Sequence, residues 1–466
     1  MYRLQEDRLK EWIAQAKPKP LILRGARQVG KSTLIQSFAA KMQLNLYEIN
    51  LENHPEMDQV FQSMDLKKII QSIEAICDKV FQPSKALVFF DEIQGTPSAL
   101  SALRLFFDNP KQYFPVVCAG SLLEFTLESY TSSMPVGRIE YLHMGPMCFE
   151  EFLIALDKQS LVNLLENFSI GDDIDAVSHG KLSKLLREYF AVGGMPEAVE
   201  SYRKQESLKA VQPILQFILD TYRGDFYKYG KKIDQRTLKL LGASFDFIPS
   251  NIGRKIKYSN ISRDEKSQYV KSAIKLLSLA RVCHLVHHSS CSGIPLKIQK
   301  SDKVFKALFL DVGLMNRQTG MDWISLNALD DVKLVNEGSV AEQFVGQQLL
   351  YDREGVTPPE LFYWQREARS SSAEVDFVVS SGDLIVPIEV KAGKSGTMKS
   401  LLQFVVEKNL DFSIRFDMNS PSQNMISNSS KTGEFTLVSL PLYLAGQLPR
   451  LLEGYRLQSA TGSGAK

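Results

Sequence analysis

The stretch Gly25-x-x-x-x-Gly30-Lys31-Ser32 carries residue types that bind phosphate. Glycines let backbone N–H groups approach phosphate oxygens, a lysine reaches the β and γ phosphates, and a serine hydroxyl can ligate magnesium. An apolar run precedes the stretch and an amphipathic run follows it, so we expect a strand, a loop and a helix whose amino terminus attracts anions. The pattern predicts a site for ATP and Mg²⁺, against the alternative of a glycine-rich turn. Its residues would be Gly25, Ala26, Arg27, Gln28, Val29, Gly30, Lys31, Ser32 and Thr33.

A second group of polar residues follows the apolar run "ALVFF", which ends in Asp91 and Glu92. A central parallel strand would deliver both acids to the edge of the sheet where the phosphate loop lies. Asp91 is then expected to hold magnesium and Glu92 to polarise the attacking water. After the next apolar run, "FPVVCAGS", Ser121 is either a sensor of the γ phosphate or the N-cap of a helix.

A third group lies far downstream, in "EVDFVVSSGDLIVPIEVKAG". Two strand-like runs there carry Asp376, Glu389 and Lys391, and burying such charges is costly unless they pair or hold a metal. The two-residue period of a strand places Glu389 and Lys391 on one face, and Glu374 on the face of Asp376. Two carboxylates could hold a second Mg²⁺ or a Mn²⁺, and the lysine could orient water against phosphate. The alternative is an ion pair between Glu389 and Lys391 in a catalytically inactive domain.

Composition allows several globular domains. The chain has 466 residues, 44% of them hydrophobic, and a formal net charge of +2, which neither requires nor excludes a nucleic-acid partner. The first residues are charged and no long uncharged apolar run occurs, so we predict a soluble cytoplasmic protein with no membrane partner. The five cysteines have no framework spacing and are expected to be reduced.

The elements that must position these groups suggest an α/β multidomain chain. We expect a phosphate-loop domain at 1–170, a helical lid or connector at 171–235, a unit of two helices and a hairpin at 236–322, an α/β domain at 323–458 and a flexible tail at 459–466. The fourth segment begins with a helix, continues with three strands, and returns through a helix to further strands.

The motifs resemble those of a known family. "DEIQ" followed by "CAGSLLEF", "VGRIEYLHMGPMCFEEFL" and "REYFAVGGMPEAV" are similar to prokaryotic ATP-binding proteins that join an AAA-like domain to a C-terminal domain of unknown function 4143. The resemblance covers nearly the whole chain. It implies a P-loop NTPase parallel sheet, a winged-helix-like unit at 236–322 and a restriction-endonuclease-like domain at 323–458.

The resemblance also implies roles for further residues. Arg138 matches an arginine that stabilises the transition state, although it could equally pair with a surface carboxylate. Asp376, Glu389 and Lys391 resemble the PD-(D/E)xK nuclease signature, with Glu342 as the helical acid upstream and as a further metal ligand. The proline usual before the first acid is absent, since Val375 stands there.

Three functions are compatible with these residues. The leading hypothesis is an ATPase that couples ATP binding and hydrolysis to a C-terminal domain engaging DNA or RNA, with nuclease activity and homo-oligomerisation as further expectations. The alternative is a nucleotide-dependent switch or scaffold whose inactive nuclease-like domain binds a protein partner. A small-molecule kinase fits less well, because nothing near the phosphate loop resembles an acceptor pocket.

Overall fold

The computed structural model describes most of the chain. The described residues are 1–108, 114–121, 123, 137–229, 234–321, 337–351, 353, 355–366, 373–393, 398–427 and 434–462. The chain divides into two units. The first comprises Met1–Gly145, Leu279–Val282 and Tyr351–Pro359, and the second comprises Pro146–Ser278, Cys283–Leu350 and Glu360–Lys466.

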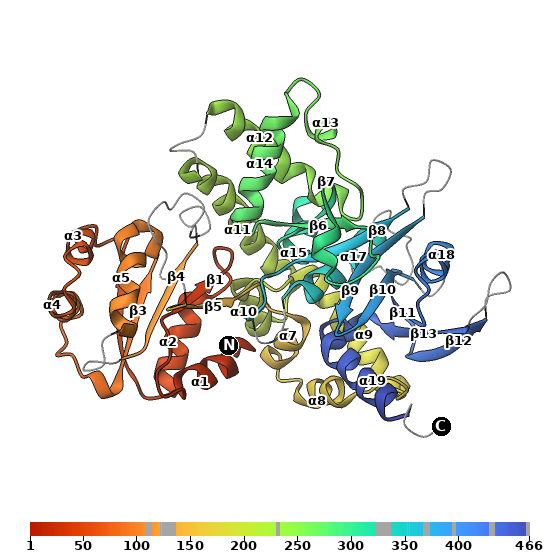
Figure 1. Ribbon diagram of the computed structural model, residues 1–466, viewed down its shortest axis with the longest axis horizontal. Coiled ribbons are helices and arrows are strands. Elements are labelled where there is room, and N and C mark those ends of the chain that lie inside the picture. Colours follow the sequence, from red (N-terminus) through yellow and green to blue (C-terminus); the bar gives the residue numbers. More distant parts are fainter. Residues whose placement is uncertain are drawn as a thin grey trace. The chain divides into compact units, whose positions relative to one another are not determined.

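The first unit is built on a five-stranded parallel sheet in the order β2-β3-β4-β1-β5 (Figure 1). Because all strands run parallel, their carboxyl ends meet at one edge, where ligands of such sheets bind. Its elements are α1 (Gln5–Ile13), β1 (Leu21–Arg24), α2 (Lys31–Lys41), β2 (Asn45–Asn50), α3 (Met57–Gln62), α4 (Leu66–Cys77), β3 (Ala86–Asp91), α5 (Pro97–Asp108), β4 (Val116–Gly120) and β5 (Glu140–His143).

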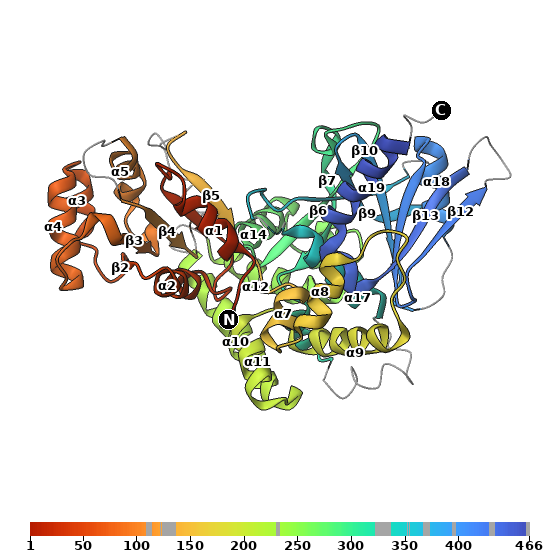
Figure 2. The ribbon, with the colours of Figure 1, turned by 90° about the horizontal axis from the view of Figure 1, so that it is seen from below.

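Helices cover both faces of this sheet, which explains its continuous apolar strands. Val88 and Phe90 of β3 pack in one core with Phe106 of α5. The intervening residues of β3, Leu87 and Phe89, are equally buried and face the other way. Figure 2 shows α5 and α2 on opposite faces.

The second unit contains an eight-stranded mixed sheet in the order β12-β13-β11-β10-β9-β8-β6-β7. Its helices are α7 (Phe149–Ala155), α8 (Gln159–Asn167), α9 (Ala176–Val192), α10 (Pro196–Gln205), α11 (Leu208–Tyr229), α12 (Gln235–Phe247), α13 (Tyr258–Ile261), α14 (Ser267–Leu279), α15 (Val312–Gln318), α17 (Glu337–Leu350), α18 (Lys399–Lys408) and α19 (Leu448–Gly462). Its strands are β6 (Cys283–Ser289), β7 (Lys300–Phe309), β8 (Leu361–Gln365), β9 (Glu374–Ser381), β10 (Leu384–Val390), β11 (Phe412–Asp417), β12 (Ser422–Ser427) and β13 (Glu434–Pro441).

Helix α17 connects this sheet to the surrounding helices through buried glutamines. The Gln343 side chain accepts from the N–H of Phe309 and donates to its carbonyl, at 2.9 and 2.8 Å. Gln347 accepts from the N–H of Val312 at 2.9 Å, and Gln348 accepts from the N–H of Phe149 at 3.0 Å. These bonds fix the depth and rotation of the helix, because a buried amide left unpaired is costly.

The predicted α/β multidomain fold is confirmed, and so is the predicted order of helix, three strands, helix and strands after residue 337. The domain boundaries stay predictions. Strand β6, expected in the unit at 236–322, pairs with β8 in parallel and so joins the same sheet as the later strands. Helix α19 extends to Gly462, into the segment expected to be a flexible tail.

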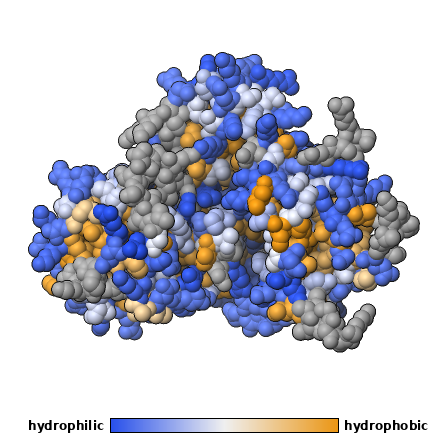
Figure 3. All heavy atoms as spheres, viewed as in Figure 1, coloured by the Kyte–Doolittle hydropathy of each residue, from blue (hydrophilic) through white to orange (hydrophobic). Residues whose placement is uncertain are grey.

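Among the described residues, no helix is long and apolar enough to cross a membrane. Figure 3 shows one face of the molecule, on which hydrophilic side chains predominate and apolar side chains form patches.

Candidate nucleotide site and carboxylate cluster

The loop between β1 and α2 has the backbone geometry that its glycines were expected to provide. Gly30 has a φ of +93°, in the left-handed region that favours glycine. A Cβ atom at Gly25 would lie 2.1 Å from the carbonyl oxygen of Met144. Any side chain at either position would therefore displace the loop at the amino terminus of α2.

Lys31 is buried at the start of α2 and, among the described residues, has no anionic hydrogen-bond partner. Its Nζ donates to the carbonyl oxygens of Gly25 and Ala26, at 3.1 and 2.8 Å. Burial lowers the pKa of Lys31 to about 8, although the charges of Asp91 and Glu92 oppose this shift. Phosphate oxygens would accept stronger, charge-assisted hydrogen bonds than these neutral carbonyls do. The ammonium group therefore fits a phosphate ligand.

Ser32 and Asp91 meet at the edge of the sheet, although Ser32 lies at the start of α2 after β1 and Asp91 ends β3, which is not a neighbour of β1. The Ser32 Oγ donates to Asp91 Oδ2 at 2.7 Å. Burial raises the pKa of Asp91 above its ordinary value, and the Ser32 hydroxyl opposes this. A hydroxyl and a carboxylate are ligands that Mg²⁺ accepts in nucleotide sites, so these residues fit a magnesium ion.

Glu92 accepts hydrogen bonds from Ser121, which directly follows β4, and from Gln94, two residues further along the chain than Glu92. Ser121 donates to it from its N–H at 3.0 Å and from its Oγ at 3.0 and 3.2 Å, and Gln94 Nε2 donates at 2.5 Å. Burial alone would raise the pKa of Glu92, but these donors lower it, which keeps the carboxylate ionised and able to accept a proton from water. Ser121 thus lies beside Glu92, and its predicted role at the γ phosphate stays a prediction. The helix it might cap lies outside the described residues.

Arg3 contributes to this site, and sequence reasoning missed it. Its guanidinium donates to the carbonyl oxygens of Val29 at 2.5 Å and Gly145 at 2.8 Å, and the residue is 4% exposed. It therefore fixes the phosphate loop from a position far away in sequence. A single arginine near the first helix belongs to no motif that could have identified it.

Arg138, expected to stabilise the transition state, forms an ion pair. Its Nε lies 2.7 Å from Asp108 Oδ1, and both side chains are 49% exposed. Its guanidinium also lies over the ring of Phe107, at 5.6 Å from the ring centre. The pair matches the alternative for this residue, and its catalytic role stays a prediction.

In the second unit, carboxylates from α17 and β9 converge on Lys306 of β7. The Lys306 Nζ lies 3.1 Å from Glu342 Oε1, 2.5 Å from Glu374 Oε1 and 3.8 Å from Asp376 Oδ1. Lys306 is 1% exposed. Burial would lower the pKa of Lys306, but the three carboxylates raise it well above its ordinary value. The sequence led us to expect Glu342 and Asp376 in one site with Glu389, and it gave no sign of Lys306 at the centre of the cluster.

A bulge in β9 directs one of these acids. The register with β8 passes from Phe362 opposite Val378 to Trp364 opposite Val375, so β9 advances three residues while β8 advances two. The extra residue lies at Asp376 or Phe377, and such a bulge changes the direction of the side chain that it carries. Asp376 Oδ2 accepts from the N–H of Val390 at 2.8 Å, which fixes the carboxylate against β10.

Glu389 and Lys391 of the predicted trio form an ion pair with each other. Glu389 is 6% exposed, and its buried Oε2 has no hydrogen-bond partner within the part of the chain that the structure describes. Burial and the charge of Asp376 raise the pKa of Glu389 to about 7. The same two-residue spacing that suggested a catalytic pair therefore also produces this ion pair.

A metal held jointly by Glu342, Asp376 and Glu389 does not fit the residues as they lie. Lys306 already neutralises Glu342, and Asp376 is shared between Lys306 and a backbone N–H. Within the described part of the chain, no three histidine, cysteine, aspartate or glutamate side chains are arranged to hold a metal ion. The metal ligands proposed for this domain stay predictions.

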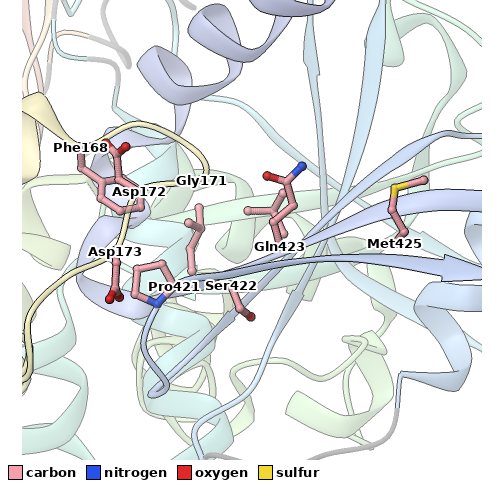
Figure 4. A pocket seen from close by; sticks show the side chains of 10 residues that line it. Phe168, Gly171, Asp172, Asp173, Pro421, Ser422, Gln423 and Met425 are labelled. Carbon is pink, nitrogen blue, oxygen red and sulfur yellow. The ribbon is translucent and has the colours of Figure 1, made fainter.

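A cavity of about 450 Å³ lies between the loop after α8 and strand β12 (Figure 4). Its acidic residues, Asp172 and Asp173, accept from the backbone N–H groups of Ser169 and Ile174, at 2.7 and 2.8 Å. These carboxylates therefore stabilise their own loop, and they do not form a catalytic group.

Comparison with protein families identifies three segments. Residues 17–153 match an AAA domain, residues 183–325 match a domain of unknown function (DUF8612), and residues 337–429 match a domain of unknown function (DUF4143). The predicted AAA domain and DUF4143 are therefore both present. Among curated proteins, none matches the sequence.

Three solved structures are similar to parts of this chain at low sequence identity. The Walker-type ATPase PABY2304 of Pyrococcus abyssi is 13% identical, with a TM-score of 0.41, over 68% of this chain and 94% of its own. The ORC2 protein of Aeropyrum pernix is 12% identical, with a TM-score of 0.34, over 71% of this chain and 93% of its own. The RuvB Holliday junction branch migration motor of Thermotoga maritima is 15% identical, with a TM-score of 0.27, over 60% of this chain and 85% of its own.

Proposed function

We propose that this protein hydrolyses Mg-ATP in its AAA domain and uses the nucleotide state to control a C-terminal half that engages nucleic acid. The observation that carries the ATPase is the meeting of Ser32 with Asp91 at 2.7 Å, next to a Lys31 that lacks an anionic partner. Together they present a hydroxyl, a carboxylate and an ammonium group at the amino terminus of α2, which is the set that a magnesium nucleotide requires.

The residues divide the work of hydrolysis. Lys31 exchanges neutral carbonyls for phosphate oxygens, and the loop backbone approaches the phosphates because Gly25 and Gly30 allow its tight turn. Ser32 and Asp91 would hold a magnesium ion, which would supply positive charge beside the phosphates. Glu92 accepts a proton from the attacking water, and Ser121 and Gln94 orient its carboxylate through the hydrogen bonds described above.

Support for nucleic-acid engagement comes from a basic loop beside the carboxylate cluster. Arg254, Lys255 and Lys257 are exposed. The N–H of Ile256 between them donates to the carbonyl of Phe305 at 2.9 Å, next to Lys306. The loop thus presents three cations at the margin of the cluster, and such groups bind a phosphate backbone without regard to sequence.

A second candidate function, nuclease activity, is favoured by one observation. The buried Oε2 of Glu389 has no partner and stands near the charge of Asp376. Against it, Lys306 pairs with the other acids, which favours the alternative of a switch or scaffold with an inactive nuclease-like domain. Cleavage of DNA or RNA by the wild type with Mg²⁺ or Mn²⁺, lost in Asp376→Asn, would establish the nuclease.

The ATPase is tested with the full chain. Wild type, Lys31→Ala and Glu92→Gln are compared for ATP binding and for phosphate release, with and without DNA or RNA. We expect Lys31→Ala to lose binding or turnover, and Glu92→Gln to bind ATP without hydrolysing it. Equal affinity and turnover in wild type and Lys31→Ala would refute the ATPase. A triple variant in which Arg254, Lys255 and Lys257 become glutamine tests nucleic-acid engagement separately, because it leaves the AAA domain unchanged.

A further inference from the structure

Lys306 lies where the acids of the C-terminal cluster converge, and oxygens of three different carboxylates lie within 3.8 Å of its Nζ. Glu342 approaches from α17, while Glu374 and Asp376 approach from β9. An ammonium group has three N–H donors and no acceptor. Glu342 and Glu374 lie within hydrogen-bond distance of the Lys306 Nζ, and Asp376, at 3.8 Å, adds a third nearby negative charge.

The second oxygens of these acids are also constrained. A Cβ atom at Gly253 would lie 2.4 Å from Glu342 Oε2, so that oxygen faces the backbone of the basic loop. Asp376 Oδ2 is already engaged with the N–H of Val390. Each oxygen of Glu342 thus has a neighbour already, Lys306 for Oε1 and the backbone at Gly253 for Oε2.

We propose that Lys306 is the resident cation of this cluster and takes the place of a divalent metal, so that Glu342 and Glu374 are partners of Lys306 and are not metal ligands. A divalent ion at the centre would have to displace the buried ammonium group or lie beside it, and like charges in a site of low dielectric constant repel strongly. The cluster therefore keeps the charges of a metal site while a side chain supplies the cation.

The role of Lys306 in this cluster does not depend on ATP hydrolysis. If Lys306 occupies the metal position, its removal converts the acids around it into a divalent site. A methionine has a similar length without the charge, so Lys306→Met removes the cation between Glu342, Glu374 and Asp376 while keeping most of the packing.

The test measures Mn²⁺ binding to the nucleotide-free full chain by the electron paramagnetic resonance of free Mn²⁺. Every sample also carries Asp91→Asn, so that the phosphate loop contributes no metal. We expect Lys306→Met to bind Mn²⁺ at least about tenfold more tightly than the parent, and Glu342→Gln to abolish that gain. In the parent itself, Glu342→Gln should leave Mn²⁺ binding unchanged.

Lys300→Met is the matched control, because it makes the same substitution on the same strand. Lys300 pairs with Glu360 at 3.5 Å, away from the cluster, so this variant should bind Mn²⁺ as the parent does. Circular dichroism confirms that each variant is folded. If Lys306→Met fails to fold, the Mn²⁺ affinities of the parent and of Glu342→Gln still test the proposal. Mn²⁺ binding by the parent that weakens in Glu342→Gln would overturn the proposal, as would a folded Lys306→Met with no gain.

Discussion

Two buried lysines, Lys31 in the first unit and Lys306 in the second, have opposite surroundings. Lys31 donates to neutral carbonyls, while the nearby Asp91 accepts only from uncharged donors. Lys306 contacts three carboxylates directly. The pKa of Lys31 is accordingly lowered by burial, whereas the carboxylates raise that of Lys306 in spite of burial.

The difference shows why similar residue types give an open site in one unit and a closed one in the other. In the first unit the cation and the acids have not neutralised each other, so a ligand with both phosphate and metal can satisfy both. In the second unit the chain has satisfied them internally. A buried charge needs a partner in either case, and what differs is whether the partner belongs to the chain.

The largest effect should come from the open site. Lys31→Ala removes the cation that would meet the phosphates, and we expect ATP turnover to fall at least about a hundredfold. Glu92→Gln should lose turnover to a similar extent while retaining ATP, because it affects the water and spares phosphate binding. Phosphate release and nucleotide binding, measured side by side, check both. ATP binding lost equally in the two variants would contradict this division of roles.

Substitution of Lys306 in the closed site of the second unit should lower the stability of the protein. Lys306→Met leaves buried carboxylates without their cation, and we expect a loss of about 3–5 kcal/mol in the free energy of unfolding of the second unit. Lys300→Met removes a partly exposed pair with Glu360 and should cost no more than about 1 kcal/mol. Denaturant unfolding of the full chain, followed in the wild type and both variants, measures the difference. Equal losses in the two variants would mean that Lys306 is not the cation on which the cluster depends.

The two lysines should also differ in their response to pH. The free site loses the Lys31 proton as pH rises through about 8, while a bound phosphate retains it, so ATP affinity should fall above pH 8 by up to about tenfold per pH unit. Without nucleotide, the free energy of unfolding changes with pH in the opposite direction to the ATP affinity. Between pH 8 and the ordinary lysine value of 10.5, the unfolded chain binds more protons than the folded one, so the first unit becomes more stable as pH rises.

Calorimetric titration of a non-hydrolysable ATP analogue at pH 7, 8 and 9 checks this prediction, with proton uptake measured in two buffers. Lys306 keeps its proton over the same range, because its pKa is raised, and provides the contrast. An affinity that stays constant from pH 7 to 9 would show that the surroundings of Lys31 do not lower its pKa.

The smallest effect within one chain is expected at Arg138. Its pair with Asp108 is half exposed, so Arg138→Ala should change the free energy of unfolding by about 1 kcal/mol or less. If Arg138→Ala lowers ATP turnover strongly although its stability changes little, Arg138 acts at the site of a neighbouring subunit. Mixing Arg138→Ala with Glu92→Gln protein should then restore part of the ATPase activity, and no recovery in mixed oligomers would count against action in trans.

The sequence determined the nucleotide site because its chemistry is local. The glycines, Lys31 and Ser32 follow one another between a strand and a helix, and the apolar run before Asp91 and Glu92 identifies a central strand. Spacing along the chain fixes these positions, since backbone geometry within one turn leaves few alternatives. The resemblance to AAA proteins and to DUF4143 was equally readable, and the family comparison confirms it.

The tertiary structure alone decided what the C-terminal acids do. Lys306 lies on β7, and its partners lie on α17 and β9, 36 residues away in the case of Glu342. Arg3 likewise meets the carbonyl of Gly145 across 142 residues. The sequence could predict that buried acids require a cation. It could not identify Lys306 as that cation, because isolated basic residues carry no periodic or motif signal. Only packing could determine that the cation is a lysine of the same chain.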